Sequence, residues 1–178
     1  MTEDPRVVFA YSAVANAFDA YVEAMERASW IVVGTDFSDG AQRALEHAVL
    51  LARDSRARVA VVHAYEDTAE TARAMEDRVP LLTTQLQDAV AGTNASRHGV
   101  HVESFLRRGA PWEKLQNVAV EVGADLIVIG ATGQGGVATV GAVVGSVVFR
   151  VIASSTRSVL ISRPPLDRAR TVEPYESR

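Results

Sequence analysis

Residues 123–136 read GADLIVIGATGQGG, and this stretch decides the fold class. After Asp125 it is apolar for four consecutive residues, and a run of glycines follows almost directly. A short apolar run without alternating polar residues is typical of a parallel strand that is covered on both faces. Glycines after such a strand let the main chain approach a bound group closely. The stretch therefore predicts a buried strand over Asp125–Ile129 and a ligand-holding loop behind it.

The same alternation of apolar runs and helical patterns extends along the chain in both directions. Further predicted strands are Trp30–Val33, Arg58–Tyr65, Val100–Leu106 and Ser158–Ser162. Apolar residues at helical spacing predict helices near 39–54, 81–95, 111–122 and 146–154. Strands that alternate with helices form a parallel sheet with right-handed crossovers. We therefore predict an α/β domain with three layers and a doubly wound, Rossmann-like sheet of five parallel strands.

Composition narrows the classes of function. Hydrophobic residues make up 48% of the chain and charged residues 22%, which supplies enough apolar material for a sizeable core. The formal net charge of −4 argues against a nucleic-acid binder, because neutralising phosphates needs clustered Lys and Arg. The absence of cysteine excludes disulfides, thiolate zinc sites and cysteine nucleophiles. The acidic first residues do not resemble a signal peptide, and no apolar run reaches the ~18 residues of a membrane span, so we expect a cytoplasmic protein without membrane contact.

The length of 178 residues fits one domain with extensions. Residues 1–28 form a predicted N-terminal extension, in which residues 12–28 have the spacing of a helix with one apolar face. Its polar face carries acidic residues, whereas a membrane-surface helix would carry Lys and Arg. We expect it to pack on its own domain or on a partner subunit. Residues 29–165 form the predicted domain, and residues 166–178 form a charged tail.

Two loops at the carboxyl edge of the predicted sheet are candidates for a ligand site. One is Gly34-Thr35-Asp36-Phe37-Ser38 after the first strand, and the other runs from Gly130 to Gly145-Ser146 at a helix start. In an open α/β sheet the ligand lies beyond the carboxyl ends of the strands, where the strand order reverses. Amide groups at a helix N-terminus favour phosphate through their dipoles. The combination favours nucleotide binding over turns that serve the fold alone.

At these residues the chain resembles the universal stress protein family. Residues 30–38, WIVVGTDFS, resemble the opening strand and turn of that family, and residues 123–133 resemble its fourth strand and phosphate loop. Residues 145–148 and 158–161 resemble its last helix and strand. The resemblance covers roughly residues 29–164 and implies the strand order 3-2-1-4-5. It also implies a stress-response regulator with little or no catalysis, at most weak ATP hydrolysis.

The resemblance implies an adenine-nucleotide site, with ATP expected and cyclic AMP or AMP as alternatives. Its implied residues are Gly34, Thr35, Asp36, Ala64, Ile129, Gly130, Gly133, Gly145, Ser146 and Val147. Asp36 would accept hydrogen bonds from the adenine or ribose, and Ala64 would line the base pocket. The main-chain amides of the last four residues and the Ser146 hydroxyl would hold the phosphates. The only lysine, Lys114, is expected to lie elsewhere, so main-chain dipoles, aided by Mg²⁺, would neutralise the phosphate charge.

The phosphate loop departs from the family pattern in its length. ATP-binding members place a nine-residue spacer between the Gly-x-x-Gly pair and the following Gly-Ser, whereas residues 134–144 form an eleven-residue spacer here. An alternative function is therefore a protein-interaction module of the same fold that does not bind nucleotide. The family commonly dimerises through its fifth strand, so the resemblance also implies a homodimer through Ser158–Ser162.

Rival enzymatic interpretations find little support in the residues. Gly133 to Ala138 match the dinucleotide fingerprint, but no acidic residue ends the next strand to hold a ribose. A P-loop needs Gly-Lys-Ser or Gly-Lys-Thr, which does not occur. His98 and His101 have metal-ligand spacing but no apparent third ligand, so we interpret them as exposed loop histidines. His63 lies among apolar strand residues and is interpreted as a histidine satisfied by the fold.

Overall fold

The computed structural model describes residues 29–66, 75–133 and 145–163. The predicted N-terminal helix, the spacer 134–144 and the charged tail 166–178 lie outside the described residues, and the statements about them stay predictions.

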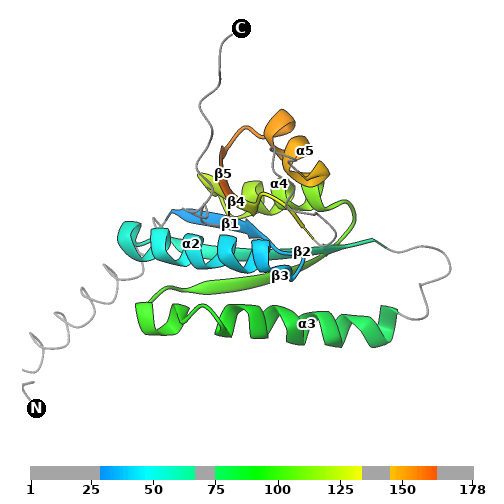
Figure 1. Cartoon of the computed structure of the whole chain (residues 1–178), viewed down its shortest axis with the longest axis horizontal. Helices are drawn as coiled ribbons and strands as arrows, with labels where there is room; N and C mark the ends of the chain where they lie inside the picture. The colour runs from blue at the N-terminus through cyan, green and yellow to red at the C-terminus, as the bar shows by residue number, and fades with distance from the viewer. Residues whose placement is uncertain (1–28, 67–74, 134–144, 164–178) are drawn as a thin grey trace, which may run out of the picture.

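Five parallel strands form one sheet at the centre of the molecule (Figure 1). The strands are β1 (Trp30–Gly34), β2 (Arg58–Tyr65), β3 (Val102–Arg108), β4 (Leu126–Gly130) and β5 (Ser158–Ser162). Their order is β3-β2-β1-β4-β5, and all four strand pairs are parallel. The predicted fold class and strand order are confirmed.

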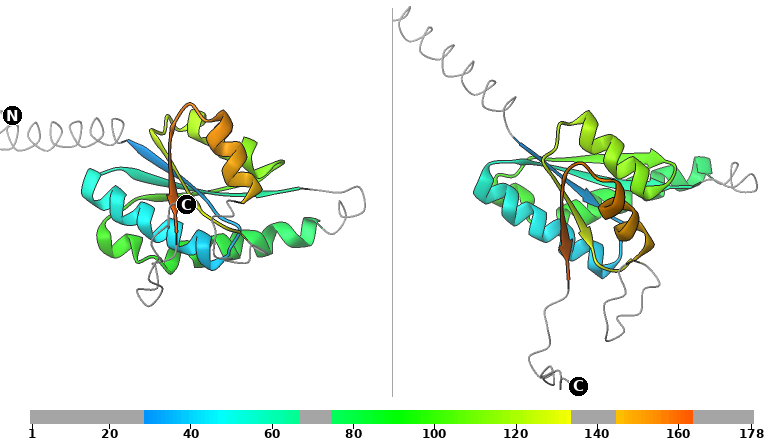
Figure 2. Two further views of the ribbon diagram at one scale, coloured as in Figure 1. Left: turned by 45° about the horizontal axis from the view of Figure 1, so that its top comes forward. Right: turned by 90° about the horizontal axis from the view of Figure 1, so that it is seen from above.

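Helices cover both faces of this sheet (Figure 2). The described helices are α2 (Asp39–Ser55), α3 (Met75–Ala91), α4 (Pro111–Glu121) and α5 (Ser146–Ser154), with a short 3₁₀ helix, η1 (Ala95–His98). Successive strand residues point to opposite faces, so β1 contributes Ile31 and Val33 to the core under α2 and α3. It contributes Val32 to the core under α4 and α5. The apolar runs are thus explained by burial on both faces.

The region from α3 to β3 differs from its prediction. The predicted helix 81–95 begins at Met75 and ends at Ala91, because the helix continues through the exposed Pro80 instead of starting after it. A proline inside a helix removes one main-chain hydrogen bond and is usually read as a helix boundary. The C-terminal end is set by Thr93, whose hydroxyl donates to the carbonyl of Val90 at 2.7 Å, and by Asn94 in the left-handed conformation.

The strand predicted at Val100–Leu106 begins two residues later, at Val102. The left-handed Gly99 ends η1, and Val100 is buried under the sheet before the ladder starts. The amide of Val59 donates to the carbonyl of His101 at 2.9 Å, so the residue just before β3 is already bonded to β2.

The order of the strands places the candidate site. From β1 the chain proceeds outward to β2 and β3, and it then crosses back to β4 on the other side of β1. This is the switch point at which open α/β sheets bind ligands. Val33 of β1 pairs with Val128 of β4, so the carboxyl ends of these two strands, Gly34 and Gly130, lie at the same edge.

Candidate functional site at the carboxyl edge of β1 and β4

The turn after β1 is built by its own polar side chains. The amide of Phe37 donates to the Thr35 hydroxyl at 3.1 Å. Both the amide and the hydroxyl of Ser38 donate to Oδ1 of Asp36, at 3.1 and 2.6 Å. The Ser38 oxygen also accepts from the amide of Ala41 at 3.2 Å, so Ser38 is the N-cap of α2. Ser38 therefore has two roles: it orients the Asp36 carboxylate, and it caps the N-terminus of α2.

Phe37 adopts a conformation that aromatic residues rarely take. Its φ of +64° lies in the left-handed region, which costs a non-glycine residue about 1–2 kcal/mol. Its ring packs against that of His63 on β2, with 4.4 Å between the ring centroids and 31° between the planes. This contact and the packing of Phe37 against the core under α2 offset the unfavourable backbone conformation.

His63 on β2 contacts the same turn. Its Nδ1 lies 2.8 Å from the carbonyl oxygen of Thr35. Because a carbonyl only accepts, Nδ1 carries the proton and donates. Burial lowers the pKa of His63, opposed by the Thr35 hydrogen bond and the charge of Asp36, while Arg78 lowers it further. The imidazole is neutral at pH 7, in agreement with the interpretation of His63 as a histidine satisfied by the fold.

The main chain of the loop after β4 packs directly against the main chain of the first turn of α2. A Cβ atom at Gly130 would lie 2.8 Å from the carbonyl carbon and oxygen of Gly40. A Cβ atom at Gly40 would in turn lie 2.7 Å from the carbonyl oxygen of Thr132. Neither position leaves room for a side chain. Gly40 was missed by the sequence analysis, although a glycine in the first turn of a helix is unfavourable and signals a close approach.

The structure brings Asp36 and Gly133 side by side, whereas the resemblance implied that Asp36 contacts the base or ribose and Gly133 the phosphates. A Cβ atom at Gly133 would overlap Oδ2 of Asp36 and would lie 3.4 Å from its Cγ. The two residues come from different loops, one after β1 and one after β4. A carboxylate is therefore held directly beside a glycine main chain at the switch point of the sheet.

The start of α5 is tied to the same loop. The amide of Gly145 donates to the carbonyl of Ala131 at 3.1 Å, and the amide of Ala131 donates to Ser162 of β5 at 2.9 Å. Gly145 is the N-cap residue of α5 and offers no side-chain hydrogen bond to the first turn. Ser146 is exposed and Val147 is half-buried. The first helical amides and the Ser146 hydroxyl thus lie where an anion would be stabilised by the helix dipole.

The remaining predicted residues differ in what they can offer a ligand. A Cβ atom at Gly34 would lie 2.9 Å from Cδ1 of Leu115 on α4, so Gly34 packs closely against this side chain. The side chain of Ile129 is buried in the core under α4 and α5, so only its main chain could contact a ligand. Ala64 is half-buried near the end of β2, two residues beyond Val62, which pairs with Gly34.

Lys114 lies at the carboxyl edge of the sheet after all. It belongs to the first turn of α4, and its stem covers Gly109, whose amide donates to Tyr65 at the end of β2 at 2.8 Å. Its Nζ forms an ion pair with Glu113 at 3.0 Å. Through Gly109 it lies beside the end of β2.

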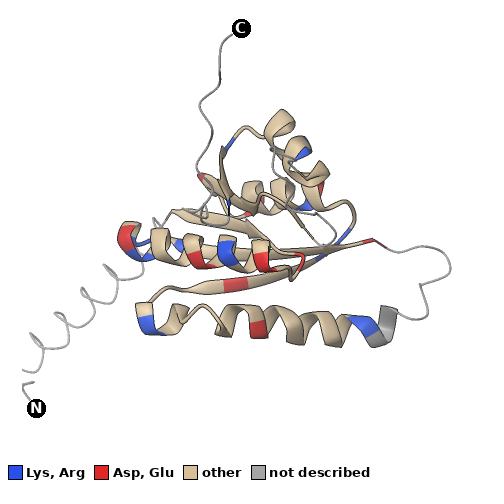
Figure 3. Cartoon of the chain, in the orientation of Figure 1, with Lys and Arg blue, Asp and Glu red and all other residues tan. Residues whose placement is uncertain are grey.

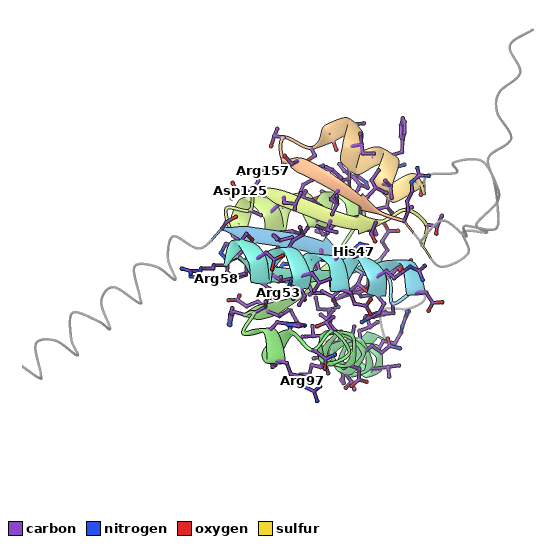
Figure 4. All side chains as sticks on the ribbon, turned by 60° about the vertical axis from the view of Figure 1, so that its left-hand side comes forward. His47, Arg53, Arg58, Arg97, Asp125 and Arg157 are labelled. Carbon is purple, nitrogen blue, oxygen red and sulfur yellow. The ribbon has the colours of Figure 1, made fainter. Side chains whose placement is uncertain are left out.

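A second pair that sequence reasoning missed links α2 to β5. Nδ1 of His47 lies 2.9 Å from the hydroxyl oxygen of Ser162, and Figure 4 shows His47 on α2 facing the β5 side of the sheet. Ser162 is only 4% exposed, so this contact satisfies a buried hydroxyl. The two residues are 115 positions apart, and no sequence pattern connects them.

The part of the chain that the structure describes offers neither a metal site nor a membrane-spanning helix. Those residues contain no group of three His, Cys, Asp or Glu side chains that could hold a metal ion. His101 pairs with Glu103 at 3.1 Å. Acidic and basic side chains are interspersed along α2, as Figure 3 shows. Among the described helices none is long and apolar enough to cross a membrane.

Comparisons with known proteins agree with this geometry. Residues 29–163 match the family model described as the universal stress protein family. A universal stress protein of Mycobacterium tuberculosis (strain H37Rv) is 32% identical over 139 residues, which are 74% of this chain and 93% of that protein. Universal stress protein YxiE of Bacillus subtilis is 29% identical over 146 residues, 75% of this chain and 97% of YxiE.

Solved structures of universal stress proteins have a similar fold. A universal stress protein in complex with cAMP superimposes with a TM-score of 0.59 at 33% identity and covers 75% of this chain and 95% of its own. The universal stress protein from Archaeoglobus fulgidus in complex with dAMP has a TM-score of 0.60 at 28% identity, with coverage of 75% and 97%.

Proposed function

The chain belongs to the universal stress protein family, and we propose that it binds an adenine nucleotide at the carboxyl edge of β1 and β4. The observation that carries this proposal is the Asp36 carboxylate held beside Gly133 at the switch point. A carboxylate accepts hydrogen bonds from an amino group or a hydroxyl but repels a phosphate, so the base or ribose belongs at Asp36. The two relatives in complex with cAMP and dAMP support the adenine class.

The phosphates then belong at the other end of the loop. The start of α5 presents main-chain amides and the exposed Ser146 hydroxyl, with no side chain on Gly145 to obstruct them. The close approach of Gly130 and Gly40 holds the described start of this loop against the first turn of α2. We propose ATP as the physiological ligand, with Mg²⁺ adding positive charge at the phosphates. The only lysine, Lys114, forms an ion pair with Glu113.

The test is calorimetric titration of the full chain with ATP and Mg²⁺, ADP, AMP and cyclic AMP. Replacing Asp36 with Ala removes the acceptor for the base or ribose, and a lost hydrogen bond to a charged group weakens affinity by roughly 10- to 100-fold. Asp39→Ala is the matched control, because Asp39 is an exposed carboxylate three residues along that starts α2. Its affinity is expected to match that of the wild type.

A third variant separates the two roles of Asp36, which are to hold the turn through Ser38 and to accept hydrogen bonds from the nucleotide. Asp36→Asn keeps an Oδ1 acceptor for Ser38 and so retains the turn, but it lacks the negative charge. It should fold like the wild type and still bind nucleotide more weakly. Absence of saturable binding by the wild type to every adenine nucleotide, or equal affinities for wild type and Asp36→Ala, contradicts the proposal.

We also propose that the chain forms a homodimer through β5. This strand is at the edge of the sheet, so one side of its main chain has no neighbouring strand in the described sheet. Three large apolar side chains on β5 and α5 are exposed: Phe149 at 70%, Ile152 at 50% and Leu160 at 37%. Exposed apolar groups beside an open strand edge favour a second copy pairing there.

The exposed face of α5 supports the second candidate function, a protein-interaction module without nucleotide. Phe149 and Ile152 are one helical turn apart on α5, where they could contact another protein as well as a second copy. This function is favoured over nucleotide binding if the titrations show no binding and the dimer persists.

A further inference from the structure

We propose that His63 is the positioning residue of the nucleotide site: its Nδ1–H group and its ring hold the Thr35–Phe37 turn in the one conformation that presents Asp36. This inference rests on the proposed function, because it concerns the residue that would receive the base or ribose. His63 itself need not touch the ligand.

The first contact lies directly before Asp36. The amide of Thr35 continues the parallel ladder by donating to Val62 at 2.9 Å, and the carbonyl of Thr35 accepts from Nδ1 of His63 at 2.8 Å. Thr35 is buried, so its carbonyl would lack a water partner if the imidazole were removed. His63 therefore fixes the peptide plane that leads into Asp36.

The second contact lies directly after Asp36. Phe37 is the only aromatic residue with a positive φ among the described residues, and its ring rests on the His63 ring. Removing that ring contact would weaken the hold on a strained residue, which favours a return to an ordinary φ. A return of Phe37 to negative φ would turn the Asp36 side chain away from Gly133.

One side chain thus brackets Asp36 on both sides. The charged groups facing the imidazole are Asp36 in the turn and Arg78 on α3, which act in opposite directions on its charge. A neutral imidazole donates to Thr35 only when its proton is on Nδ1. The ring nitrogen and the ring face have separable roles, and two substitutions can separate them.

The experiment compares two replacements of His63 in the full chain. His63→Asn places an amide nitrogen at the same number of bonds from Cα as Nδ1, so it keeps the donor and loses the ring. His63→Phe keeps a ring for Phe37 and loses the donor. Val62→Ala is the control for general destabilisation, because Val62 is buried on the same strand and points to the opposite face.

The first readout needs no nucleotide. Amide hydrogen exchange of Phe37 and Ser38, followed by NMR, reports opening of the turn. Loss of one hydrogen bond is expected to speed exchange at both amides by roughly 3- to 10-fold in His63→Phe. In His63→Asn the exchange of Ser38 should stay within about 2-fold of the wild type, because the donor to Thr35 is retained. Val62→Ala should lower the melting temperature without changing the ratio of turn exchange to global exchange.

The second readout is affinity for ATP or AMP by titration calorimetry. It should fall by roughly 3- to 10-fold in His63→Phe, which loses the donor, and by a smaller factor in His63→Asn, which keeps the donor but loses the ring contact with Phe37. It should remain unchanged in Val62→Ala. A wild-type protein that binds no nucleotide overturns the proposed function, and the exchange measurement still decides the positioning role. Unchanged turn exchange in a folded His63→Phe overturns the inference.

A third readout uses the wild type alone and covers the case in which a variant does not fold. NMR of ring nitrogens distinguishes the two neutral forms of an imidazole. We expect the Nδ1–H form for His63 at pH 7.5 and a ring proton that exchanges slowly with solvent. Observation of the Nε2–H form, which cannot donate to Thr35 through Nδ1, overturns the inference.

Discussion

At the scale of single residues, one added methyl group tests how the two loops meet. In Gly130→Ala the new Cβ would lie 2.8 Å from the main chain of Gly40, which cannot move without shifting α2. Overpacking against main chain typically costs about 1–3 kcal/mol of stability. Urea denaturation should show this loss. Gly92→Ala is the control, since its Cβ would lie nearest to the end of a side chain, the Gln42 amide at 3.3 Å, instead of main chain. It should change stability by less than about 0.5 kcal/mol. Equal stabilities for the two variants would show that the loops do not touch.

His63 makes stability depend on pH in a defined direction. Burial keeps the pKa of His63 in the folded protein below the unfolded value of ~6.5, so the unfolded chain binds more protons between the two values. The free energy of unfolding therefore falls as the pH drops below ~6.5, and the effect is complete below the folded pKa. Melting temperatures from pH 7.5 to 5 should decline more for the wild type than for His63→Asn. Parallel curves would mean that His63 titrates alike in both states.

At the scale of elements, α2 depends on its first capping residue. Ser38→Ala removes the hydroxyl that accepts from Ala41 and donates to Asp36, and loss of an N-cap costs about 1 kcal/mol. Urea denaturation of this variant should show that loss. Ser38→Thr keeps a hydroxyl and should retain most of the stability. If both substitutions lower stability equally, the cap does not stabilise α2.

Most strands could be predicted from the sequence, because a strand buried on both faces is a continuous run of apolar residues. β1, β2, β4 and β5 are apolar runs, and their predicted strands agree with the structure. α3 was placed too late because Pro80 obscured its first turns, and β3 was placed too early because Val100 is buried before the ladder begins. In both cases tertiary packing outweighed the local signal.

The candidate site was predictable to the extent that it follows from topology. Asp36 and Gly133 end up side by side because strands β1 and β4 end at the same edge. Gly40 and the His47–Ser162 pair were not predicted, since their contacts join segments with no common period. Their positions depend on how α2 lies across the sheet, which only the packed structure defines.

At the scale of the whole molecule, the proposed dimer can be separated from the fold. Leu160→Arg places a charge on the exposed side of β5, where a second copy would bury it at a cost of several kcal/mol. The variant should sediment as a folded monomer. Leu81→Arg on α3 changes a 58% exposed leucine on the opposite flank of the sheet and should leave the dimer intact. A Leu160→Arg protein that remains dimeric would place the interface elsewhere.

The two main-chain hydrogen bonds of Ala131 affect how the loop between β4 and α5 can change in length. Its amide is bonded to β5 and its carbonyl to Gly145, so the segment between Ala131 and Gly145 begins and ends at one pinned point of the sheet. The entropy of closing such a ring grows only with the logarithm of its length, so extending a spacer from nine to eleven residues costs only ~0.2 kcal/mol. Insertions here therefore hardly change the free energy of unfolding. The length of this loop can then vary during evolution while the sheet is retained.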